Sequence, residues 1–241
     1  MATLAEKPTA STTPAPAAPG VLVLDVGGTH VKVQMEGQTE PVKIVSGPAM
    51  TAQKMADAVR KATAEWHYTS ASLGYPGPVV HGKPLHDPAN LGEGWVGFDF
   101  EKALGCPVKV VNDAAMQALG SYQGGRMLFL GLGTGLGSTM IVEGIVQPLE
   151  LAHLPYKKKT YEDYVGLRGM KKFGKKKWRR EVEDVVARLQ AALEPDYVIL
   201  GGGNVKLLKQ LPSGCKLGAN ENAFLGGVRM WKPKTGEPVV A

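Results

Sequence analysis

Cysteine is scarce in this chain, and its scarcity excludes several kinds of protein. Of 241 residues, only Cys106 and Cys215 are cysteines, and they lie far apart. They provide neither a disulfide framework nor a cysteine-rich metal site, which fits a reducing compartment. No apolar run approaches the ~20 residues that a membrane span needs, and the N-terminus has no apolar core of a signal peptide. We therefore expect a cytoplasmic protein that makes no membrane contact.

The rest of the composition is that of a globular protein. Hydrophobic residues make up 44% of the chain and charged residues 21%, which excludes a chain that is disordered throughout. The length allows one large domain or two lobes of about 100 residues each. Residues 1–20 are rich in Ala, Thr and Pro, and this composition predicts a disordered leader.

Positive charge is concentrated in residues 157–180, which we call the basic segment. The whole chain carries a formal net charge of +6, but the basic segment alone carries +9 and the remainder −3. A segment of this charge can attract a polyanion. Runs of charge are also commonly no more than a solvated face, so the sequence leaves both interpretations open.

A glycine-rich turn near the start of the chain predicts an anion site. The turn lies in Asp25–Lys32, where Gly27 and Gly28 separate the apolar run Val21–Leu24 from a second run that contains Val31 and Val33. Glycines can adopt a positive φ, and the N–H groups of such a turn lie together without a Cβ to block a phosphate. A carboxylate such as Asp25 suits this position if a metal ion or a transferred proton needs it. An ordinary hairpin that happens to use Gly-Gly stays open as the alternative.

Two further glycine turns follow strands later in the chain. Gly131–Gly135 contains Thr134 and lies between the predicted strands 127–130 and 136–142. Its resemblance to the first turn, about a hundred residues earlier, indicates two lobes that present phosphate-binding turns to one cleft. The third turn, Gly201–Asn204, leads from a strand into a helix predicted over 205–211. Further helices are predicted over residues 51–66, 98–104, 114–122, 179–193 and 220–230.

Asp113 is the candidate general base. It follows Asn112 where a predicted strand, 108–111, meets a predicted helix. Ligands of α/β proteins gather at the carboxyl ends of strands, although a helix cap alone would also place an Asp here. A kinase acting on a hydroxyl needs a base near that hydroxyl, and donors and Mg²⁺ around the phosphoryl group. Sugar hydroxyls call for amides and carboxylates, which are available in Asn90, Asn112, Glu150, His153 and Glu162.

Taken in order, these motifs resemble those of the ROK sugar kinases, and among them the polyphosphate-using glucokinases. The resemblance covers nearly everything after residue 20. It is carried by Asp25-Val-Gly-Gly-Thr-His-Val-Lys, Pro76-Gly-Pro, Ala89-Asn-Leu with Gly94-Trp95, Asn112-Asp-Ala, Gly131-Leu-Gly-Thr-Gly and Gly201-Gly-Gly-Asn. It implies a two-lobed actin-like ATPase fold of the ribonuclease H-like α/β type, in which each lobe is a mixed sheet with flanking helices.

The same resemblance implies transfer of a phosphoryl group to the 6-hydroxyl of glucose. Asp113 would be the base and would bind the sugar together with Asn90, Asn112, Glu150, His153 and Glu162. Asp25 would orient Mg²⁺ through water. The phosphoryl donor would contact Gly27, Gly28, Thr29, Lys32, Gly133, Thr134 and Gly135, and its adenosine part would lie at Gly201, Gly202, Gly203 and Asn204.

The expected donor is inorganic polyphosphate, with ATP as a second donor. The basic segment would follow the polyanion by charge, through Lys157, Lys158, Lys159, Lys171, Lys172, Lys175, Lys176, Lys177, Arg179 and Arg180. An ATP-only glucokinase or hexokinase is the main alternative. A non-catalytic sugar-sensing or nucleic-acid-binding protein belongs to a different class, and intact phosphate turns argue against it. A polyphosphate hydrolase would leave the sugar-type residues unexplained.

Two departures from the family pattern matter. The wider family has Glu-x-Gly-His followed by a cysteine cluster that binds zinc, but here Ala152 replaces that Gly and no Cys lies between Pro107 and Gly214. We therefore expect no zinc. The leader also lacks the helix-turn-helix of the family's repressors. We expect a small lobe of residues 21–111 with 221–241 and a large lobe of residues 112–220. The sequence leaves the oligomeric state open, and a homodimer is one of the possible states.

Overall fold

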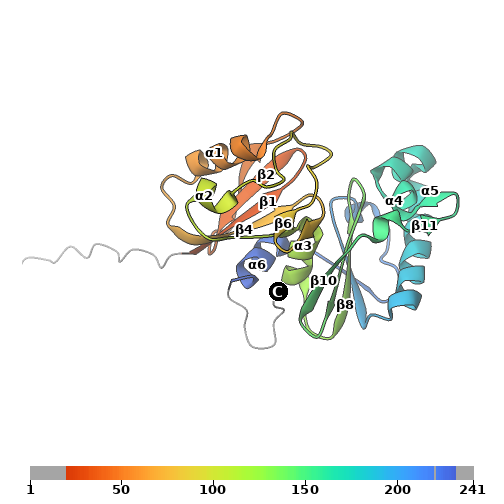
Figure 1. The fold of residues 1–241 in the computed structure, drawn as a ribbon. Coiled ribbons are helices and arrows are strands. Elements are labelled where there is room, and N and C mark those ends of the chain that lie inside the picture. Colours follow the sequence, from red (N-terminus) through yellow and green to blue (C-terminus); the bar gives the residue numbers. More distant parts are fainter. Residues whose placement is uncertain (1–19, 220, 232–241) are drawn as a thin grey trace, which may run out of the picture.

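The computed structural model describes residues 20–219 and 221–231, which form two β-sheets with helices between and around them (Figure 1). Residues 1–19 of the predicted leader, residue 220 and residues 232–241 of the predicted small lobe lie outside the described residues. None of the helices in the described ranges combines the length and the apolar content that a membrane span requires.

The first sheet has the strand order β3-β2-β1-β4-β7. Strands β1, β2 and β3 form an antiparallel meander, and β4 and β7 are added in parallel beside β1. The strands are β1 (Gly20–Val26), β2 (His30–Met35), β3 (Val42–Val45), β4 (Tyr68–Tyr75) and β7 (Val108–Asn112). The parallel strands β1, β4 and β7 therefore end together at one edge of the sheet.

The second sheet repeats this pattern with the order β10-β9-β8-β13-β14. Strands β8, β9 and β10 are an antiparallel meander, and β13 and β14 run parallel to β8. The strands are β8 (Arg126–Leu132), β9 (Leu136–Val142), β10 (Ile145–Leu149), β13 (Tyr197–Gly201) and β14 (Cys215–Leu217). In both sheets a glycine turn joins the first two strands of the meander.

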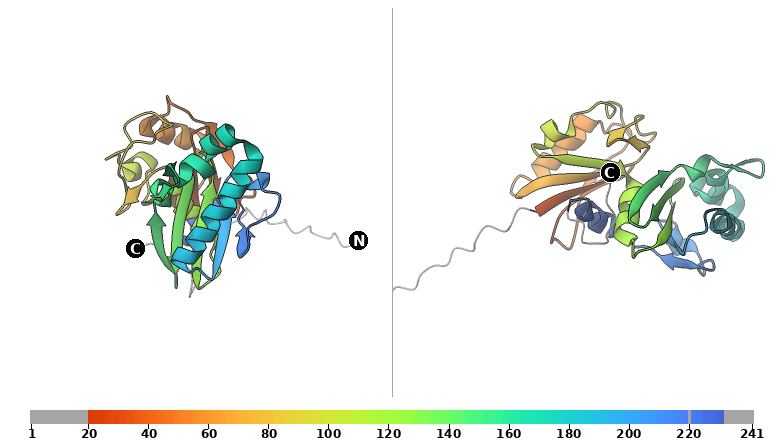
Figure 2. Two further views of the ribbon diagram at one scale, coloured as in Figure 1. Left: turned by 90° about the vertical axis from the view of Figure 1, so that its right-hand side faces the viewer. Right: turned by 60° about the horizontal axis from the view of Figure 1, so that its bottom comes forward.

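Helices separate and cover the two sheets. Apolar residues of β1 alternate between its faces: Leu22 and Leu24 pack toward α1 (Ala52–Ala62), and Val21 and Val23 pack toward α3 and α6. Helices α3 (Asp113–Ser121) and α6 (Asn222–Arg229) lie between the sheets (Figure 1). On the outer face of the second sheet, α5 (Leu167–Leu193) lies across the strands (Figure 2).

Helix α3 belongs to two cores at once. Met116 and Leu119 pack against the first sheet with Ala223 of α6, and Ala118 and Tyr122 pack against the second sheet. Gly120 and Gly226 let α3 and α6 cross in backbone contact, because a Cβ on Gly120 would overlap the carbonyl oxygen of Asn222 and a Cβ on Gly226 that of Met116. This packing fixes the position of α3, whose first residue is Asp113.

The remaining elements are short. They are the hairpin β5 (Val79–Val80) with β6 (Lys83–Pro84), α2 (Phe100–Leu104), the hairpin β11 (Pro155–Tyr156) with β12 (Lys159–Thr160), α4 (Tyr161–Val165), and single 3₁₀ turns at Leu151–His153 and Val205–Leu207. Hairpin β11–β12, α4 and the first half of α5 carry the basic segment.

Two helix predictions differ from the structure. The helix expected over 179–193 begins already at Leu167, and the non-helical Gly174 interrupts it. The sequence pattern misses its first half because this half is rich in lysine and has few apolar residues at helical spacing. The helix expected over 205–211 is a single 3₁₀ turn. Its last carbonyl, that of Leu207, accepts a hydrogen bond from Arg179 Nε at 2.7 Å instead of continuing a helical ladder.

Candidate active site

A cavity of about 440 Å³ lies where both glycine turns and the start of α3 meet. Most of the predicted sugar and phosphate residues line it. They are Gly27, Gly28, Asn90, Asn112, Asp113, Gly133, Thr134, Gly135, Glu150, His153, Glu162 and Gly202. Asp25, Thr29, Lys32, Gly201, Gly203, Asn204 and the lysines and arginines of the basic segment are not among its lining residues.

Asp113 occupies the first turn of α3, directly after strand β7. The helix cap is provided by Asn112, whose Oδ1 accepts hydrogen bonds from the N–H groups of Ala114 at 2.9 Å and Ala115 at 3.3 Å. Asn112 Nδ2 donates to the carbonyl of Gly77 at 3.0 Å. Both ends of the Asn112 amide therefore hold backbone, and the next residue, Asp113, lines the cavity.

Burial brings the pKa of Asp113 close to neutrality. Desolvation, and then the negative charge of Asp25, raise the pKa of Asp113 from 3.8 to about 7, although the N–H of Ala114 donates to its Oδ1 at 2.8 Å and opposes this shift. A carboxylate with a pKa near neutrality can accept a proton from a hydroxyl in the course of a reaction. A helix cap alone does not require such a carboxylate, since Asn112 already provides the cap.

The first glycine turn differs from its prediction in one respect. Neither Gly27 nor Gly28 adopts a positive φ. The glycines are needed for space: a Cβ on Gly27 would lie 2.9 Å from the carbonyl oxygen of His30, and one on Gly28 would lie 3.2 Å from Cβ of Asn90. Gly28 therefore lets the loop that carries Asn90 approach the turn. Hydrogen bonds from Ser46 to Gly27 and Thr29 fix the turn from outside.

Lys32 is engaged by Asp25. Its Nζ lies 2.8 Å from Asp25 Oδ2, because the two residues are directly opposite in the β1–β2 register. The Asp25 side chain is 14% exposed. The ammonium of Lys32 therefore pairs with a mostly buried carboxylate beside the first turn.

The second glycine turn is held by α4 and α5. The N–H of Leu167, the first residue of α5, donates to the carbonyls of Gly133 at 3.2 Å and Thr134 at 3.0 Å. A Cβ on Gly135 would lie 2.7 Å from Glu162 Oε2, so a larger residue would displace that carboxylate. The second turn and Glu162 are therefore in direct contact, and helix α5 begins next to the turn.

Glu150, His153 and Glu162 form a polar wall of the cavity. His153 Nε2 lies 4.0 Å from Glu150 Oε2, and Arg168 Nη2 lies 3.7 Å from Glu162 Oε1. Burial, and a smaller repulsion from Glu162, raise the pKa of Glu150 against the opposing effect of His153. Carboxylates and an imidazole arranged in this way can accept and donate hydrogen bonds to several hydroxyl groups of one ligand.

Ser138 is a cavity residue that the sequence did not reveal. Its Oγ donates to the carbonyl of Leu149 at 2.7 Å and accepts from the N–H of Leu151 at 3.1 Å. It therefore fixes the backbone on both sides of Glu150. A lone serine inside an apolar strand carries no motif, so only the folded pairing of β9 with β10 could reveal it.

The third glycine turn reaches the cavity only at Gly202. That glycine has φ +83°, which an L side chain rarely adopts, and it lies against the backbone of Leu132. Asn204 Nδ2 donates to the carbonyl of Gly133 at 2.8 Å. The third turn therefore supports the second turn by direct contact.

The residues of the basic segment divide by what they contact. Lys157 pairs with Glu181, and Arg179 binds the carbonyl of Leu207. Lys172 and Lys177 lie over the ring of Phe173, with Nζ 5.4 and 4.5 Å from its centroid. The exposed residues of the set are Lys157, Lys158, Lys159, Lys171, Lys172, Lys175, Lys176, Lys177 and Arg180.

Two larger hollows do not compete with this cavity as the reaction site. One, of about 890 Å³, lies at the end of α1 around Arg60 and Trp66. The other, of about 590 Å³, lies between α6 and the β2–β3 connection, and Lys32 is the single predicted site residue that lines it. Neither is lined by the two paired glycine turns or by Asp113, so chemistry is favoured in the smaller cavity.

Comparison with known proteins identifies the family to which this two-sheet architecture belongs. The sequence profile of the ROK family matches residues 21–148. The chain belongs to the ROK family. A polyphosphate glucokinase of Mycobacterium tuberculosis is 27% identical over 202 residues, which are 75% of this chain and 76% of that protein. A polyphosphate glucokinase of Mycobacterium leprae is 28% identical over 203 residues, covering 75% and 62%.

Solved structures confirm the expected fold. An inorganic polyphosphate/ATP-glucomannokinase from Arthrobacter sp. strain KM superposes with a TM-score of 0.74 at 23% identity, covering 87% of this chain and 96% of that one. A ROK family glucokinase from Streptomyces griseus, in complex with glucose and AMPPNP, gives 0.71 at 16% identity, covering 89% and 100%. The fold is that of the actin-like ATPases, and the relatives support a sugar kinase.

Proposed function

We propose that this protein is a glucokinase that transfers a phosphoryl group from inorganic polyphosphate, and also from ATP, to the 6-hydroxyl of glucose. The observation that carries the proposal is the cavity in which Asp113, with a pKa of about 7, faces two glycine turns and the wall of Glu150, His153 and Glu162. The matched relatives act on glucose or use polyphosphate, as their names state.

Asp113 is the proposed base. The sugar 6-hydroxyl would donate a hydrogen bond to its carboxylate, and the proton would pass to Asp113 as the oxygen bonds to phosphorus. The bond between that phosphorus and the donor oxygen then breaks, and the shortened donor leaves with the electron pair. Because the pKa of Asp113 is close to neutral, the same group can release its proton to solvent after the product departs.

Magnesium fits the carboxylates next to the first turn. Mg²⁺ is usually held by one or two carboxylates, several waters and the substrate phosphates. Asp25, coupled by charge to Asp113, offers such a carboxylate, and among the described residues no cluster of three or more His, Cys, Asp or Glu side chains could bind a metal by itself. Bound there, the ion would neutralise charge on the phosphoryl group, next to the ion pair of Asp25 with Lys32.

The proposed division into lobes gives the cavity a means to close. The small lobe would comprise residues 21–111 and 221–241, which include α6, and the large lobe residues 112–220. Glucose would lie against Glu150, His153 and Glu162 of the large lobe and against Asn90 of the small lobe. Closure over the sugar would exclude water from the phosphoryl group.

The position of α5 supports polyphosphate as the phosphoryl donor, because this lysine-rich helix begins at the second glycine turn. Its first N–H contacts Gly133 and Thr134 of the second turn, and Lys171, Lys172, Lys175 and Lys176 follow as exposed cations on the same helix. A chain of phosphates leaving the turn would meet this charge without any specific contact. Polyphosphate as the donor is the part of the proposal that rests on these lysines.

The decisive experiment is a coupled assay for glucose 6-phosphate with polyphosphate, ATP and GTP in turn. Replacing Lys171, Lys172 and Lys175–Lys177 by Gln should raise the KM for polyphosphate by about tenfold and leave the KM for glucose unchanged. A matched control replaces five exposed lysines elsewhere: Lys54, Lys61, Lys83, Lys102 and Lys216. Equal effects of the two sets would remove the role of α5.

Salt provides a second test of the donor. Added salt screens exposed charges, so polyphosphate use should weaken with salt more steeply than ATP use. Activity with ATP alone would establish the ATP-only kinase instead. Absence of sugar phosphate with every donor would favour the non-catalytic alternatives.

A further inference from the structure

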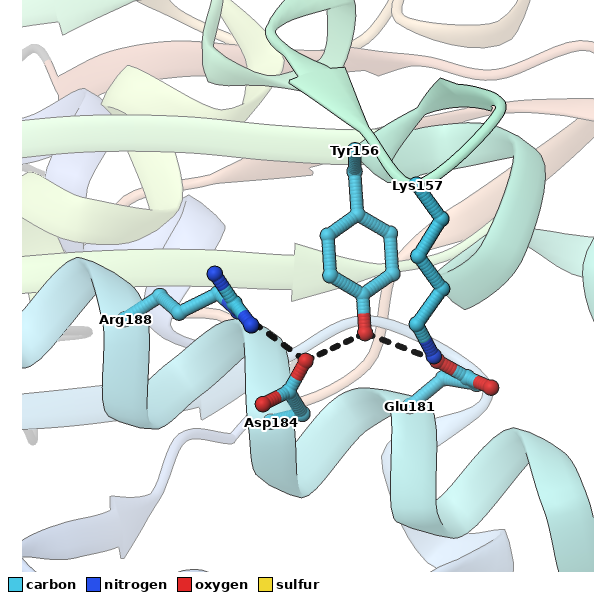
Figure 3. Close-up of polar contacts among 5 residues, drawn as sticks. All are labelled: Tyr156, Lys157, Glu181, Asp184 and Arg188. Atoms are coloured by element: carbon cyan, nitrogen blue, oxygen red, sulfur yellow. Dashed lines mark hydrogen bonds and ion pairs between the residues drawn. The ribbon is translucent and has the colours of Figure 1, made fainter.

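A cluster of charged side chains lies outside the cavity, between hairpin β11–β12 and helix α5 (Figure 3). The Tyr156 hydroxyl lies 2.7 Å from Glu181 Oε2 and also contacts Asp184 Oδ2. The Lys157 ammonium pairs with Glu181, and Arg188 Nε donates to Asp184 Oδ2 at 3.0 Å. The cluster therefore joins the hairpin to the helix through one hydroxyl, two carboxylates and two cations.

Burial at the centre makes this cluster sensitive to the loss of any partner. Tyr156 and Glu181 are each only 4% exposed. Burial works against the charge of Glu181, but hydrogen bonds from Lys157 and Tyr156 lower its pKa overall. Removing one partner of a buried carboxylate strongly destabilises the folded state, because it leaves a buried charge without compensation. The single proton of the Tyr156 hydroxyl lies between two anions, which the two cations neutralise.

The cluster anchors the chain between two parts of the cavity wall. Tyr156 lies three residues after His153 and six before Glu162, and both of these residues line the cavity. The ring of Tyr156 also packs against Tyr161 and Tyr164, with centroids 5.2 and 5.1 Å apart. These tyrosines lie in α4 on either side of Glu162. Tyr156 thus fixes the segment 153–164, because its hydroxyl contacts α5 and its ring packs against α4.

The other end of the anchor is rigid. Helix α5 packs on the second sheet through Val182, Val185 and Val186, each at most 2% exposed. Trp178 Nε1 donates to the carbonyl of Val165 at the end of α4, at 2.6 Å. A continuous set of contacts therefore runs from the sheet through α5 and Tyr156 to the side chains that face the cavity.

We infer that Tyr156, with Lys157 and Glu181, is a positioning cluster that sets the separation of Glu150 and His153 from Glu162 and so determines sugar binding. The inference rests on the proposed function. It assigns Lys157 to the acceptor side of the reaction, in contrast to the sequence prediction that Lys157 contacts polyphosphate. Small displacements of groups that orient a substrate are costly, because the site must be held to within a fraction of an ångström.

Tyr156→Phe tests the hydroxyl while keeping the ring. The change removes the contacts of the hydroxyl with Glu181 and Asp184 and so loosens the hold on the cavity wall. We expect the KM for glucose to rise by about tenfold with polyphosphate and with ATP, while kcat changes less than about twofold. Tyr197→Phe is the matched control. Among the described residues its hydroxyl bonds the backbone of Gln123 and Gly124, and none of these three residues lines the cavity.

Lys157→Gln separates the two assignments of this residue, and its half-exposed side chain makes it the safer variant to fold. As part of the positioning cluster, the change raises the KM for glucose with either donor and leaves the KM for polyphosphate unchanged. An increase confined to polyphosphate would overturn the inference. So would a Tyr156→Phe enzyme that matches Tyr197→Phe in its KM for glucose.

The wild-type enzyme keeps the two failures apart. If it forms no sugar phosphate with any donor, the proposed function falls, and the inference falls with it. If the wild type is active and both variants retain its KM for glucose, the positioning role alone is refuted.

Discussion

Replacing Asp113 by Asn should abolish most activity and at the same time stabilise the fold. The pKa of Asp113 rises from 3.8 to about 7 in the folded protein, because of burial first and the charge of Asp25 second. A carboxyl whose folded pKa is raised binds its proton more tightly in the folded state. The folded state therefore loses stability as the pH rises from the unfolded to the folded pKa.

The magnitude follows from the shift. At about 1.36 kcal/mol for each pKa unit, the ionised Asp113 costs the fold about 4 kcal/mol above neutral pH, and most of this develops between pH 5 and pH 8. An Asn avoids the charge but keeps a partly buried amide. We therefore expect Asp113→Asn to raise the free energy of unfolding at pH 8 by about 1–4 kcal/mol, and by less at pH 5.

Urea unfolding at pH 5 and pH 8, without substrates or Mg²⁺, measures this difference. In the coupled assay the same variant should lose a factor of about 10²–10⁴ in kcat, the usual contribution of a positioned base. Titration of glucose by calorimetry should give a dissociation constant close to that of the wild type. A stability difference that is the same at both pH values would refute the role of charge burial. A near-normal kcat would refute the assignment of the base.

Two further outcomes are expected. Gly120→Ala should reduce the free energy of unfolding by about 3 kcal/mol or more, because a methyl group overlaps the backbone of α6 and overpacking costs about 1–3 kcal/mol even between side chains. Gly203→Ala is the control, because Gly203 is an exposed loop glycine with open space around it and no positive φ. Equal losses of stability in the two variants would contradict the close crossing of α3 and α6. Treatment with a zinc chelator should leave thermal unfolding unchanged, and a lower Tm would show that the expectation of no zinc is wrong.

The sequence predicted the parts of the fold that have a strong local pattern. The strand before Gly27, the strands around Gly133 and the junction at Asn112 and Asp113 were all apparent, because apolar runs that end in Gly or Asn mark strand ends. The edge strands β3, β10 and β14 were not predicted. They are short and expose much of their surface, as Val45 at 74% and Leu217 at 63% illustrate, so no alternation distinguishes them from loops.

The candidate site could be predicted only as a set of residue types. The cavity lining includes Asn90, Glu150 and Glu162, but their sequence positions gave no hint of Ser138, which fixes the backbone around Glu150. Contacts between residues far apart in sequence, such as Tyr156 with Glu181, depend on where α5 crosses the sheet. The sequence predicted glycine at position 27 both for a positive φ and for the absence of a Cβ. The positive φ is wrong, and the space taken by the carbonyl of His30 is what requires glycine.

The membership of α3 in two cores has a consequence for cooperativity. Residues on one side of the helix complete the apolar core of the first sheet, and residues on the other side complete that of the second. Opening either half would expose part of the core of the other half, so the two halves should melt together in a single transition. Asp113, the first residue of α3, thus lies where the two cores meet, and local fraying of one half cannot separate it from the other half.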